Sequence, residues 1–417
     1  MQNKVKKQKA VITGMGVISP LGENVNEYWA NLEQGVSGIG PMTLCDPSEF
    51  PSKIAGEVNT FDPITYIDKK EAKRMARFSQ MAVAAANLAI ENANITFTKD
   101  ELNRTAVIIG NGNGGFPEIE QNARAQVLKG ETKVSPYFIP MILPNMAAAN
   151  ISRIFGFKGF SSTVVTACAA STQSIGDAAL LINNEMCDIV LAGGCESGIT
   201  KLGLGGFSAL RALSTQNEEP AKASKPFDIN RDGFVPAEGA GMFVIESEGH
   251  AIKRGANILC EIVGMGVSSD AHHPVQPDPS GDGAILSMER ALNNANINNE
   301  EIDYINAHGT STPLNDICET NALKKLFKEH AYKVPISSTK SMIGHVLGGA
   351  GALEGIATVL SIINQKAHPT INLETPDPEC DLNYVPNKSV DVNINYAMSN
   401  NFGFGGQNAS IIFRKPS

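Results

Sequence analysis

A cysteine among small residues is the first candidate for chemistry in this sequence. Residues 164–171 read VVTACAAS, and Cys168 stands at their centre. The apolar residues before Cys168 predict a buried strand, and the small residues after it predict the start of a helix. At a helix N-terminus the helix dipole favours thiolate over thiol, which would make Cys168 a nucleophile. Taken alone, the segment fits a buried, unreactive cysteine better.

A histidine stands in a second segment that could carry chemistry. Residues 306–316 read NAHGTSTPLND, so His308 follows a predicted strand and precedes a turn from which it can face a cleft. Thr310 and Thr312 are two residues apart, which places both hydroxyl groups on one side of an extended stretch. An isolated histidine in such a loop more often stabilises the loop itself.

Two later segments add a lysine, a second histidine and two aromatic residues. Residues 337–351 read SSTKSMIGHVLGGAG, with Lys340 five residues before His345 and glycines that allow close backbone approach. Residues 400–408 read NNFGFGGQN, which places Phe402 and Phe404 between glycines. An aromatic side chain in such a loop can swing as a gate, or it can simply pack in the core.

A cysteine, two histidines and a lysine are compatible with three kinds of chemistry. A cysteine hydrolase uses one histidine as base and usually an Asn or Asp that orients it. A zinc site has characteristic ligand spacings, which these four residues do not show. Acyl transfer with decarboxylation needs a thiolate and several hydrogen-bond donors around a developing enolate.

Composition and charge narrow the class of protein. The chain has 417 residues, 42% of them hydrophobic, which predicts either two domains or two fused similar halves. A net charge of −9 argues against general nucleic-acid binding. The basic start of the chain leads into a predicted first strand at residues 10–17 and not into a signal peptide. No window approaches ~20 apolar residues, so we expect a cytoplasmic protein that does not cross a membrane.

Seven cysteines are present, an odd number with no CxxC pair, so neither disulfides nor a metal site are expected. They are Cys45, Cys168, Cys187, Cys195, Cys260, Cys318 and Cys380.

Strand and helix patterns alternate along the chain, which predicts an α/β protein with buried sheets. Short β-branched runs at 106–109, 189–191 and 242–245 alternate with helical patterns such as 80–94 and 172–182. There is also an internal echo, ITGMGVIS at 12–19 and IVGMGVSS at 262–269. The echo predicts a duplicated unit joined near residue 255, with halves 1–255 and 256–417.

Together the four segments resemble the elongating β-ketoacyl-acyl carrier protein synthases, most closely synthase II, over essentially the whole chain. TACAAS, NAHGTSTP, SSTKSMIGH and NNFGFGG occur in the family's order and spacing, as do AGG at 192–194, KPFD at 225–228 and RDGFV at 231–235. The resemblance implies a thiolase-like fold of five layers, αβαβα, built from two similar halves. It also implies a decarboxylating Claisen condensation with malonyl-acyl carrier protein in fatty acid synthesis.

The resemblance assigns a role to each candidate residue. Cys168 would carry the acyl group, and His308 and His345 would stabilise the enolate of the malonyl thioester. Backbone N–H groups of Cys168 and Phe404 would form the oxyanion hole. Lys340 would pair with Glu319 and tune the histidines. The remaining implied positions are the supporting Asp316, the pantetheine contacts Thr310 and Thr312, and the pocket residues Asn113, Phe402 and Phe404.

The resemblance also implies partners. No cofactor is expected to be bound, because the acyl carrier protein supplies the phosphopantetheine arm. Lys70, Lys73, Arg74 and Arg211 match the family's carrier-docking positions, and a local basic patch suits a strongly acidic carrier. The family is dimeric, so we expect a homodimer, or a heterodimer with a chain-length factor.

Departures from the family pattern concern the substrate. Asn113 stands where family members usually carry an apolar residue at the edge of the acyl pocket, and a buried amide needs hydrogen-bond partners. The HHPV of residues 272–275 and Gln407 also depart from the usual sequence. These features leave open a ketosynthase of a type II polyketide synthase. A thiolase would need a second cysteine as base, and a chain-length factor would lack Cys168.

Overall fold

The computed structural model describes residues 8–130 and 133–416, and within these ranges ten strands form one mixed sheet. The first half of the chain contributes β1 (Ala10–Ile18), β4 (Ala106–Gly110), β5 (Ser161–Val164), β6 (Ile189–Glu196) and β7 (Gly239–Ser247). The second half contributes β8 (Cys260–Ser269), β9 (Tyr304–Asn306), β10 (Ile336–Ser337), β13 (Tyr396–Gly403) and β14 (Gln407–Arg414).

The two halves repeat one strand order on either side of the centre of the sheet. The full order is β10-β9-β13-β14-β8-β1-β7-β6-β4-β5, so each half runs first, fifth, fourth, second, third from the centre outward. The first strands, β1 and β8, pair antiparallel, with Ala10 opposite Ile262. These are the strands that carry the echoed sequence, so the predicted construction from two similar halves is confirmed.

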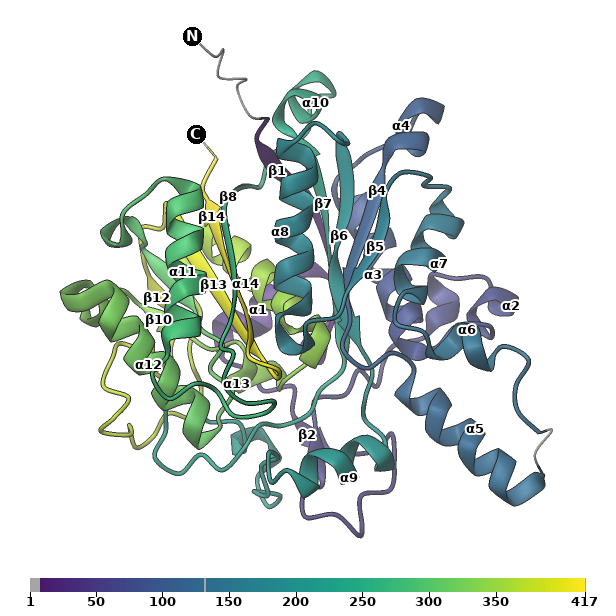
Figure 1. Cartoon of the computed structure of the whole chain (residues 1–417), viewed down its shortest axis with the longest axis horizontal. Helices are drawn as coiled ribbons and strands as arrows, with labels where there is room; N and C mark the ends of the chain where they lie inside the picture. The colour runs from purple at the N-terminus through teal and green to yellow at the C-terminus, as the bar shows by residue number, and fades with distance from the viewer. Residues whose placement is uncertain (1–7, 131–132, 417) are drawn as a thin grey trace.

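The two halves of this continuous sheet form two layers. Helices between them and outside them bring the number of layers to five (Figure 1). The central layer holds α8 (Ala170–Asn183) and α14 (Ala350–Asn364), each of which packs against strands of both halves. One outer layer is formed by α3 (Arg77–Asn92) and α7 (Met146–Phe155) on the first half of the sheet. The other contains α11 (Asp282–Ala295) and α12 (Pro313–Phe327) in the second half. The predicted αβαβα arrangement is confirmed.

The echoed glycines explain how the outer helices approach the sheet so closely. A Cβ atom at Gly16 in β1 would lie 2.0 Å from the carbonyl oxygen of Ala85 in α3. Its counterpart Gly266 in β8 would place a Cβ atom 1.9 Å from the carbonyl oxygen of Ser287 in α11. Only glycine fits at these contacts, so the same helix-on-strand packing requires the same GMG sequence twice.

The central helix α14 is unusually apolar because it is enclosed. The stretch Leu347–Asn364 is long and apolar enough to cross a membrane by composition, although the sequence analysis noted no such window. However, 89% of that stretch is buried inside the structure. A helix with apolar residues all round is expected wherever protein surrounds it, and α14 lies between two sheet layers.

The elements expected from short patterns are present with small shifts at their ends. The run at 106–109 is β4, the run at 189–191 extends to Glu196 in β6, and the pattern at 80–94 is α3. Lys70 lies in a four-residue helix, α2 (Lys69–Ala72), which ends before Lys73 and Arg74, and α3 begins at Arg77. All seven cysteines are free thiols. The first residues of the basic N-terminal stretch, 1–7, lie outside the described ranges.

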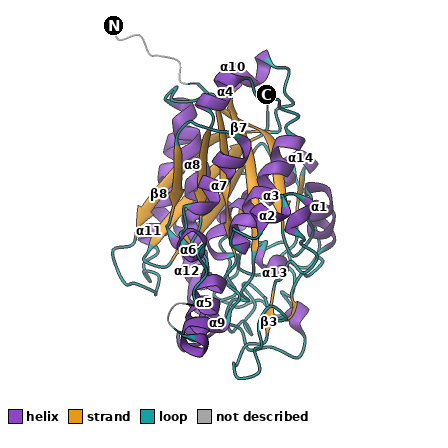
Figure 2. Cartoon of the chain, turned by 90° about the vertical axis from the view of Figure 1, so that its right-hand side faces the viewer, coloured by secondary structure: helices purple, strands orange, loops and turns teal. Residues whose placement is uncertain are grey.

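Two helices lie together beside the catalytic end of the sheet. α5 (Phe116–Lys129) contacts α9 (Lys201–Ala209), and Figure 2 shows them side by side at the lower end of the molecule. The Glu120 carboxylate accepts a 2.7 Å hydrogen bond from the Leu202 N–H at the start of α9. Phe207 of α9 lines the cavity that contains Cys168.

Candidate active site

Cys168 lies at the strand-to-helix turn that the sequence predicted. The short 3-10 helix η2 (Ala167–Ala169) connects the region after β5 to α8, and Cys168 is its central residue. Ala167 has φ of +49°, a left-handed conformation that is uncommon for a residue with a side chain. This strained turn presents the buried Cys168 side chain to the cavity.

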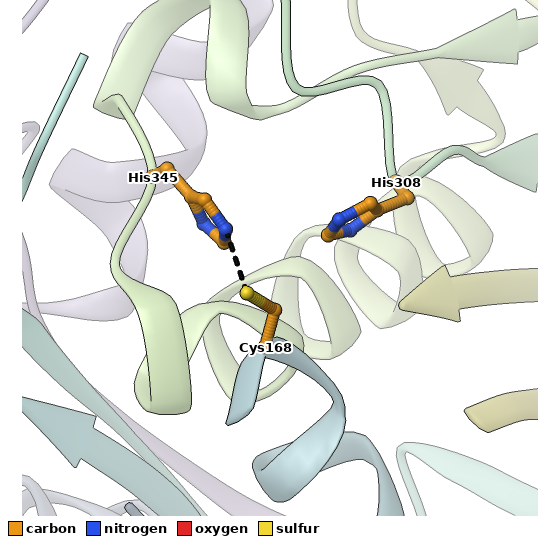
Figure 3. A group of neighbouring side chains, drawn as sticks. All are labelled: Cys168, His308 and His345. Carbon is orange, nitrogen blue, oxygen red and sulfur yellow. Dashed lines mark hydrogen bonds between the residues drawn. The ribbon is translucent and has the colours of Figure 1, made fainter. Parts of the chain in front are cut away.

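The second half of the chain builds the matching turn for His345. The 3-10 helix η6 (Leu347–Gly349) precedes α14 as η2 precedes α8, and Leu347 has φ of +48°. His345 stands two residues before η6, and its Nε2 lies 3.0 Å from the Cys168 Sγ (Figure 3). The two related halves therefore place a nucleophile and a histidine face to face.

His308 completes the group from the loop between β9 and α12. Its ring centroid lies 5.5 Å from that of His345, and the two planes are nearly perpendicular at 82°. One ligand-type atom from each of Cys168, His308 and His345 lies within 4.8 Å of the others. All three side chains are buried. Residues separated by up to 177 positions in the chain are thus brought together, as the motifs predicted.

Hydrogen bonds to the remote ring nitrogens fix the tautomer of both histidines. The Leu347 backbone N–H donates to the His345 Nδ1 at 3.3 Å. The Lys340 Nζ and the Asn401 Nδ2 lie 3.2 and 3.3 Å from the His308 Nδ1, and both are donors. Each Nδ1 is therefore an acceptor, so each neutral ring carries its proton on Nε2. Burial lowers the pKa of both histidines well below the usual value, and the Lys340 charge adds to this effect.

The ion pair of Lys340 differs from the expected one. The sequence resemblance implied pairing with Glu319, but the Lys340 Nζ lies 2.5 Å from the Glu354 Oε1 in α14. Lys340 also donates to the His308 backbone carbonyl at 2.6 Å. The expected pairing is wrong because α14 directs the Glu354 carboxylate toward Lys340, whereas Glu319 is engaged elsewhere.

Glu319 and Asp316 hold the loop that carries His308. The Glu319 carboxylate accepts the backbone N–H groups of His308 and Gly309, both at 2.8 Å. Burial raises the pKa of Glu319 to about 7, against the lowering effect of those two hydrogen bonds. Asp316 accepts the Phe227 N–H at 2.9 Å and faces the Arg231 guanidinium at 3.5 Å. Both carboxylates therefore support the loop and do not enter the cavity.

The Cys168 thiol is less acidic than its position at a helix N-terminus led us to expect. Burial raises the pKa of Cys168 to about 12, and this effect outweighs the lowering caused by the Lys340 charge and by a hydrogen bond from the Phe404 backbone N–H. The negative charges of Glu354 and Glu196 act in the same direction as burial. Donors nevertheless converge on Sγ, so a thiolate formed there would be stabilised at once.

A backbone donor pair lies close to the sulfur. The Phe404 N–H reaches Cys168, and the glycine before it permits this approach. A Cβ atom at Gly403 would lie 2.8 Å from the Thr166 carbonyl oxygen and 3.2 Å from the Cys168 backbone nitrogen. Any side chain at position 403 would push these segments apart. This packing places the two N–H groups that the resemblance named for an oxyanion hole on the same side of the site.

Cysteine and two histidines are also common zinc ligands, but their surroundings do not suit a metal ion. Histidine ligands usually donate their remote N–H to an acceptor, which leaves the other nitrogen free for the metal. Here both Nδ1 atoms face donors, so both Nε2 atoms carry hydrogen. The ammonium group of Lys340 next to His308 further opposes a cation. Both rings are therefore hydrogen-bond donors at Nε2, and the His345 Nε2–H faces the Cys168 sulfur.

A cavity of about 790 Å³ surrounds the site, and both halves line it. It includes the predicted pantetheine contacts Thr310 and Thr312, whose hydroxyl oxygens lie 2.9 Å apart. Asn113 also lines the cavity, so the expectation that it borders the pocket agrees with its position. The other predicted pocket residues, Phe402 and Phe404, also line the cavity, and so does Arg211, which was predicted as a carrier-docking position.

The other docking candidates lie on the surface at α2. Lys70, Lys73 and Arg74 are exposed. Among the described residues no carboxylate lies within ion-pair distance of Lys70 or Lys73, whereas Arg74 pairs with Glu71 at 3.4 Å. Arg77, the nearby first residue of α3, pairs instead with the buried Glu238 at 2.7 Å and is structural.

Sequence reasoning missed two residues that contact the catalytic group. Glu354 is the single charged residue in the apolar helix 350–364, and such a lone carboxylate could have signalled a buried partner. Asn401 stood inside the recognised NNFGFGG segment without a role. Its Nδ2 donates to Glu354 at 2.8 Å, and its Oδ1 contacts the Thr172 hydroxyl. These two side chains fix the position of Lys340 and His308.

Comparison with known proteins agrees with this geometry. The family described as "Beta-ketoacyl synthase, N-terminal domain" matches residues 7–251, and "Beta-ketoacyl synthase, C-terminal domain" matches residues 259–374. A 3-oxoacyl-[acyl-carrier-protein] synthase 2 of Coxiella burnetii is 47% identical over 99% of both chains. The protein of the same name from Synechocystis sp. is 44% identical over 99% of both chains.

Solved structures give the same result. The ishigamide ketosynthase/chain length factor superposes with a TM-score of 0.92 at 34% identity, covering 99% of this chain and 100% of that one. A β-ketoacyl synthase from Burkholderia phymatum gives 0.91 at 34% identity, with 98% and 100% coverage. The predicted thiolase-like fold and the predicted ketosynthase of fatty acid synthesis are both confirmed. The chain therefore belongs to the β-ketoacyl synthase family, the acyl-transferring condensing enzymes that extend a carbon chain.

Proposed function

We propose that Cys168 carries the growing chain and that His308 and His345 serve the malonyl substrate. In the first half-reaction the Cys168 sulfur attacks the carbonyl carbon of an acyl thioester. The new C–S bond forms, the carrier thiolate leaves, and the proton of Cys168 is released. The N–H groups of Cys168 and Phe404 donate to the oxyanion of the tetrahedral intermediate.

In the second half-reaction a malonyl thioester occupies the same cavity. The bond from its central carbon to the carboxylate breaks, carbon dioxide leaves, and the electron pair forms an enolate. The two Nε2–H groups donate to the enolate oxygen. The carbanion then attacks the acyl carbonyl carbon, and the C–S bond to Cys168 breaks. The products are a β-ketoacyl thioester and the Cys168 thiolate, which regains a proton.

The grouping of the three side chains carries this proposal: the His345 Nε2 lies 3.0 Å from the Cys168 sulfur, and a ring nitrogen of His308 lies within 4.8 Å of both. The test is intact-mass analysis after incubation with an acyl-coenzyme A. Wild type should gain one acyl group, and Cys168→Ala should gain none and should not condense. The variant should still release carbon dioxide from malonyl-coenzyme A, because both histidines remain. An acyl adduct on Cys168→Ala would show that the nucleophile lies elsewhere.

We further propose that an acyl carrier protein delivers both substrates on its phosphopantetheine arm. Arg211 at the cavity supports an acidic partner, and so do the exposed Lys70 and Lys73 at α2, which pair with no carboxylate of the described residues. The arm would pass Thr310 and Thr312 on its way to Cys168. The enzyme would act in the cytoplasm and would bind no cofactor of its own.

A dimer is supported by the free edge of the sheet. β5 is the last strand of the order and is half-exposed along most of its length. Val165 beside it is 53% exposed, and Val127 of α5 is 84% exposed. Light scattering would distinguish a homodimer from a monomer that needs a second, chain-length-factor subunit.

A polyketide ketosynthase is the second candidate, and Asn113 favours it. The Asn113 Nδ2 would lie 3.3 Å from a Cβ atom at Gly198, and among the described residues its amide has no side-chain hydrogen bond. A poly-β-keto chain offers carbonyl groups to this amide, and a saturated chain offers none. Replacing Asn113 by Ile should then favour saturated over β-keto thioesters of equal length. An unchanged preference would remove this support for the second candidate.

A further inference from the structure

Besides Glu319, Asp316 and Glu354, a further buried carboxylate lies beside the catalytic cavity, and the reaction outlined above does not use it. Glu196 is the last residue of β6 and is fully buried. Its Oε2 accepts the Gly112 N–H at 2.9 Å and the Gly348 N–H at 3.1 Å. Its Oε1 accepts the Asn113 N–H at 3.3 Å. One side chain therefore accepts three backbone N–H groups, of which that of Gly348 is buried and those of Gly112 and Asn113 are partly buried.

The donors of Glu196 come from opposite halves of the chain. Gly112 and Asn113 belong to the loop after β4, and both line the cavity. Gly348 belongs to η6 in the second half. These loops touch, because a Cβ atom at Gly348 would lie 2.3 Å from the Gly112 nitrogen. The Glu196 Oε2 thus connects the loop after β4, which lines the cavity, to the turn that follows His345.

The contact continues directly to the catalytic histidine. Leu347, the residue before Gly348, donates its N–H to the His345 Nδ1 at 3.3 Å. That bond keeps the hydrogen on Nε2 and aims it at Cys168. We propose that Glu196 is a positioning residue that fixes both the Asn113 wall of the acyl pocket and the His345 tautomer. The proposal rests on the proposed function of His345.

The pKa of the Glu196 carboxyl group lies close to neutral pH. Burial raises the pKa of Glu196 to about 7, against the lowering effect of its backbone hydrogen bonds. The nearby titratable thiols are Cys168 and Cys195, and both feel the carboxylate charge. Three backbone N–H groups donate to this buried carboxylate. Replacing Glu196 by a residue without an acceptor would leave those N–H groups without hydrogen-bond partners.

Two substitutions separate the two roles. Glu196→Ala removes every acceptor, so it should lower kcat for malonyl-coenzyme A decarboxylation at least tenfold while KM stays within twofold. Glu196→Gln keeps one oxygen for Gly112 and Gly348 but turns an NH₂ group toward Asn113. It should retain decarboxylation within threefold and change the ratio of hexanoyl to acetyl transfer onto Cys168 at least threefold.

A matched control tests whether the effect is merely one of stability. Asp228 is equally buried and also accepts three backbone N–H groups, those of Asn230, Glu374 and Thr375, but it does not line the cavity. Asp228→Ala should lower Tm without lowering kcat of the folded enzyme. Equal kcat losses in Asp228→Ala and Glu196→Ala, or full decarboxylation by Glu196→Ala, would overturn the proposal, as would a Glu196→Gln variant with an unchanged hexanoyl-to-acetyl ratio.

The wild-type measurements distinguish this inference from the proposed function. Wild-type enzyme that neither acylates Cys168 nor decarboxylates malonyl-coenzyme A would refute both. Wild-type enzyme that does both, with Glu196 variants that behave like wild type, would refute only the role of Glu196.

Discussion

At the scale of single residues, the chemistry depends on two protons held on Nε2. Because each Nδ1 accepts a hydrogen bond, neither histidine in this tautomer is arranged to remove the proton of Cys168. In the proposed reaction, His308 and His345 are instead donors to a developing negative oxygen. Acylation and decarboxylation therefore draw on different groups in one cavity.

Removing either histidine should affect decarboxylation more than acylation. We expect His308→Ala and His345→Ala to lower malonyl decarboxylation about 10²–10³-fold, the usual effect of losing one oxyanion donor. Acylation should survive in both, and His345→Ala should show the larger loss because its Nε2–H reaches the sulfur. Single-turnover acylation and carbon dioxide release are measured separately. His330→Ala is the control, and normal decarboxylation in variants that no longer acylate would contradict this division.

The pH dependence of acylation follows from the buried thiol. Burial raises the pKa of Cys168 to about 12, so at neutral pH the reactive thiolate is the minor form. At a pH well below that pKa, raising the pH by one unit increases the thiolate fraction tenfold. Single-turnover acylation by acetyl-coenzyme A should therefore accelerate about tenfold per unit between pH 6 and pH 8.5. A rate that does not change with pH would mean that the sulfur is already ionised in the resting enzyme.

The sequence predicted the position of single residues where a motif determines the local chain conformation, and their catalytic roles stay predictions. Cys168, His308 and His345 were found because each stands in a recognisable turn next to a strand or helix. The partner of Lys340 was not found, because Glu319 and Glu354 are both helical carboxylates that could reach it. Which one faces Lys340 depends on how α12 and α14 pack, and no local pattern records that packing.

At the scale of elements, the Lys340–Glu354 pair joins the start of α13 (Lys340–Ile343) to α14. Both side chains are buried, so removing one partner leaves an uncompensated charge. Glu354→Ala should therefore destabilise the protein by roughly 3–5 kcal/mol and disturb Asn401, which donates to the same carboxylate.

Replacing both partners separates stability from catalysis. The double variant Lys340→Met with Glu354→Leu removes both charges, so it should recover most of the lost stability. It should not recover decarboxylation, because His308 loses Lys340, one of the two donors on its Nδ1. Urea unfolding and carbon dioxide release are the two measurements. A double variant that decarboxylates like wild type would show that the ion pair is only structural.

The short helix α2 should act on the carrier and not on the chemistry. Charge reversal of Lys70, Lys73 and Arg74 to Glu should raise KM for carrier-bound substrate about tenfold at low salt. Coenzyme A thioesters should react almost normally, because exposed charges mainly affect association. Lys253→Glu, on the exposed face of α10 (Glu248–Lys253), is the control. Equal losses with both kinds of substrate would mean that α2 supports the fold.

At the scale of the whole molecule, duplication creates the active site. Each half supplies a strand, a strained turn and a central helix, and the site forms where the two turns meet. The repeated GMG sequence revealed this symmetry from the sequence alone, because close packing of a helix on a strand requires glycine at fixed positions. No comparable repeat in the sequence indicates the contact between Cys168 and His345, because that contact depends on the packing of α8 and α14 across the two halves.

The same packing predicts that neither half folds alone. We place the boundary at residue 255, which lies between β7 and β8 and between the two family matches. Separating 1–255 from 256–417 exposes one side of α8 and one side of α14, which pack against strands of the other half. Each fragment should therefore aggregate, or should form a state that unfolds without a cooperative transition by circular dichroism. Co-expressing both fragments should restore a folded complex that acylates Cys168, since the cut itself lies in a surface connection. A cooperative thermal transition for either fragment alone would show that the halves are independent domains and not one shared core.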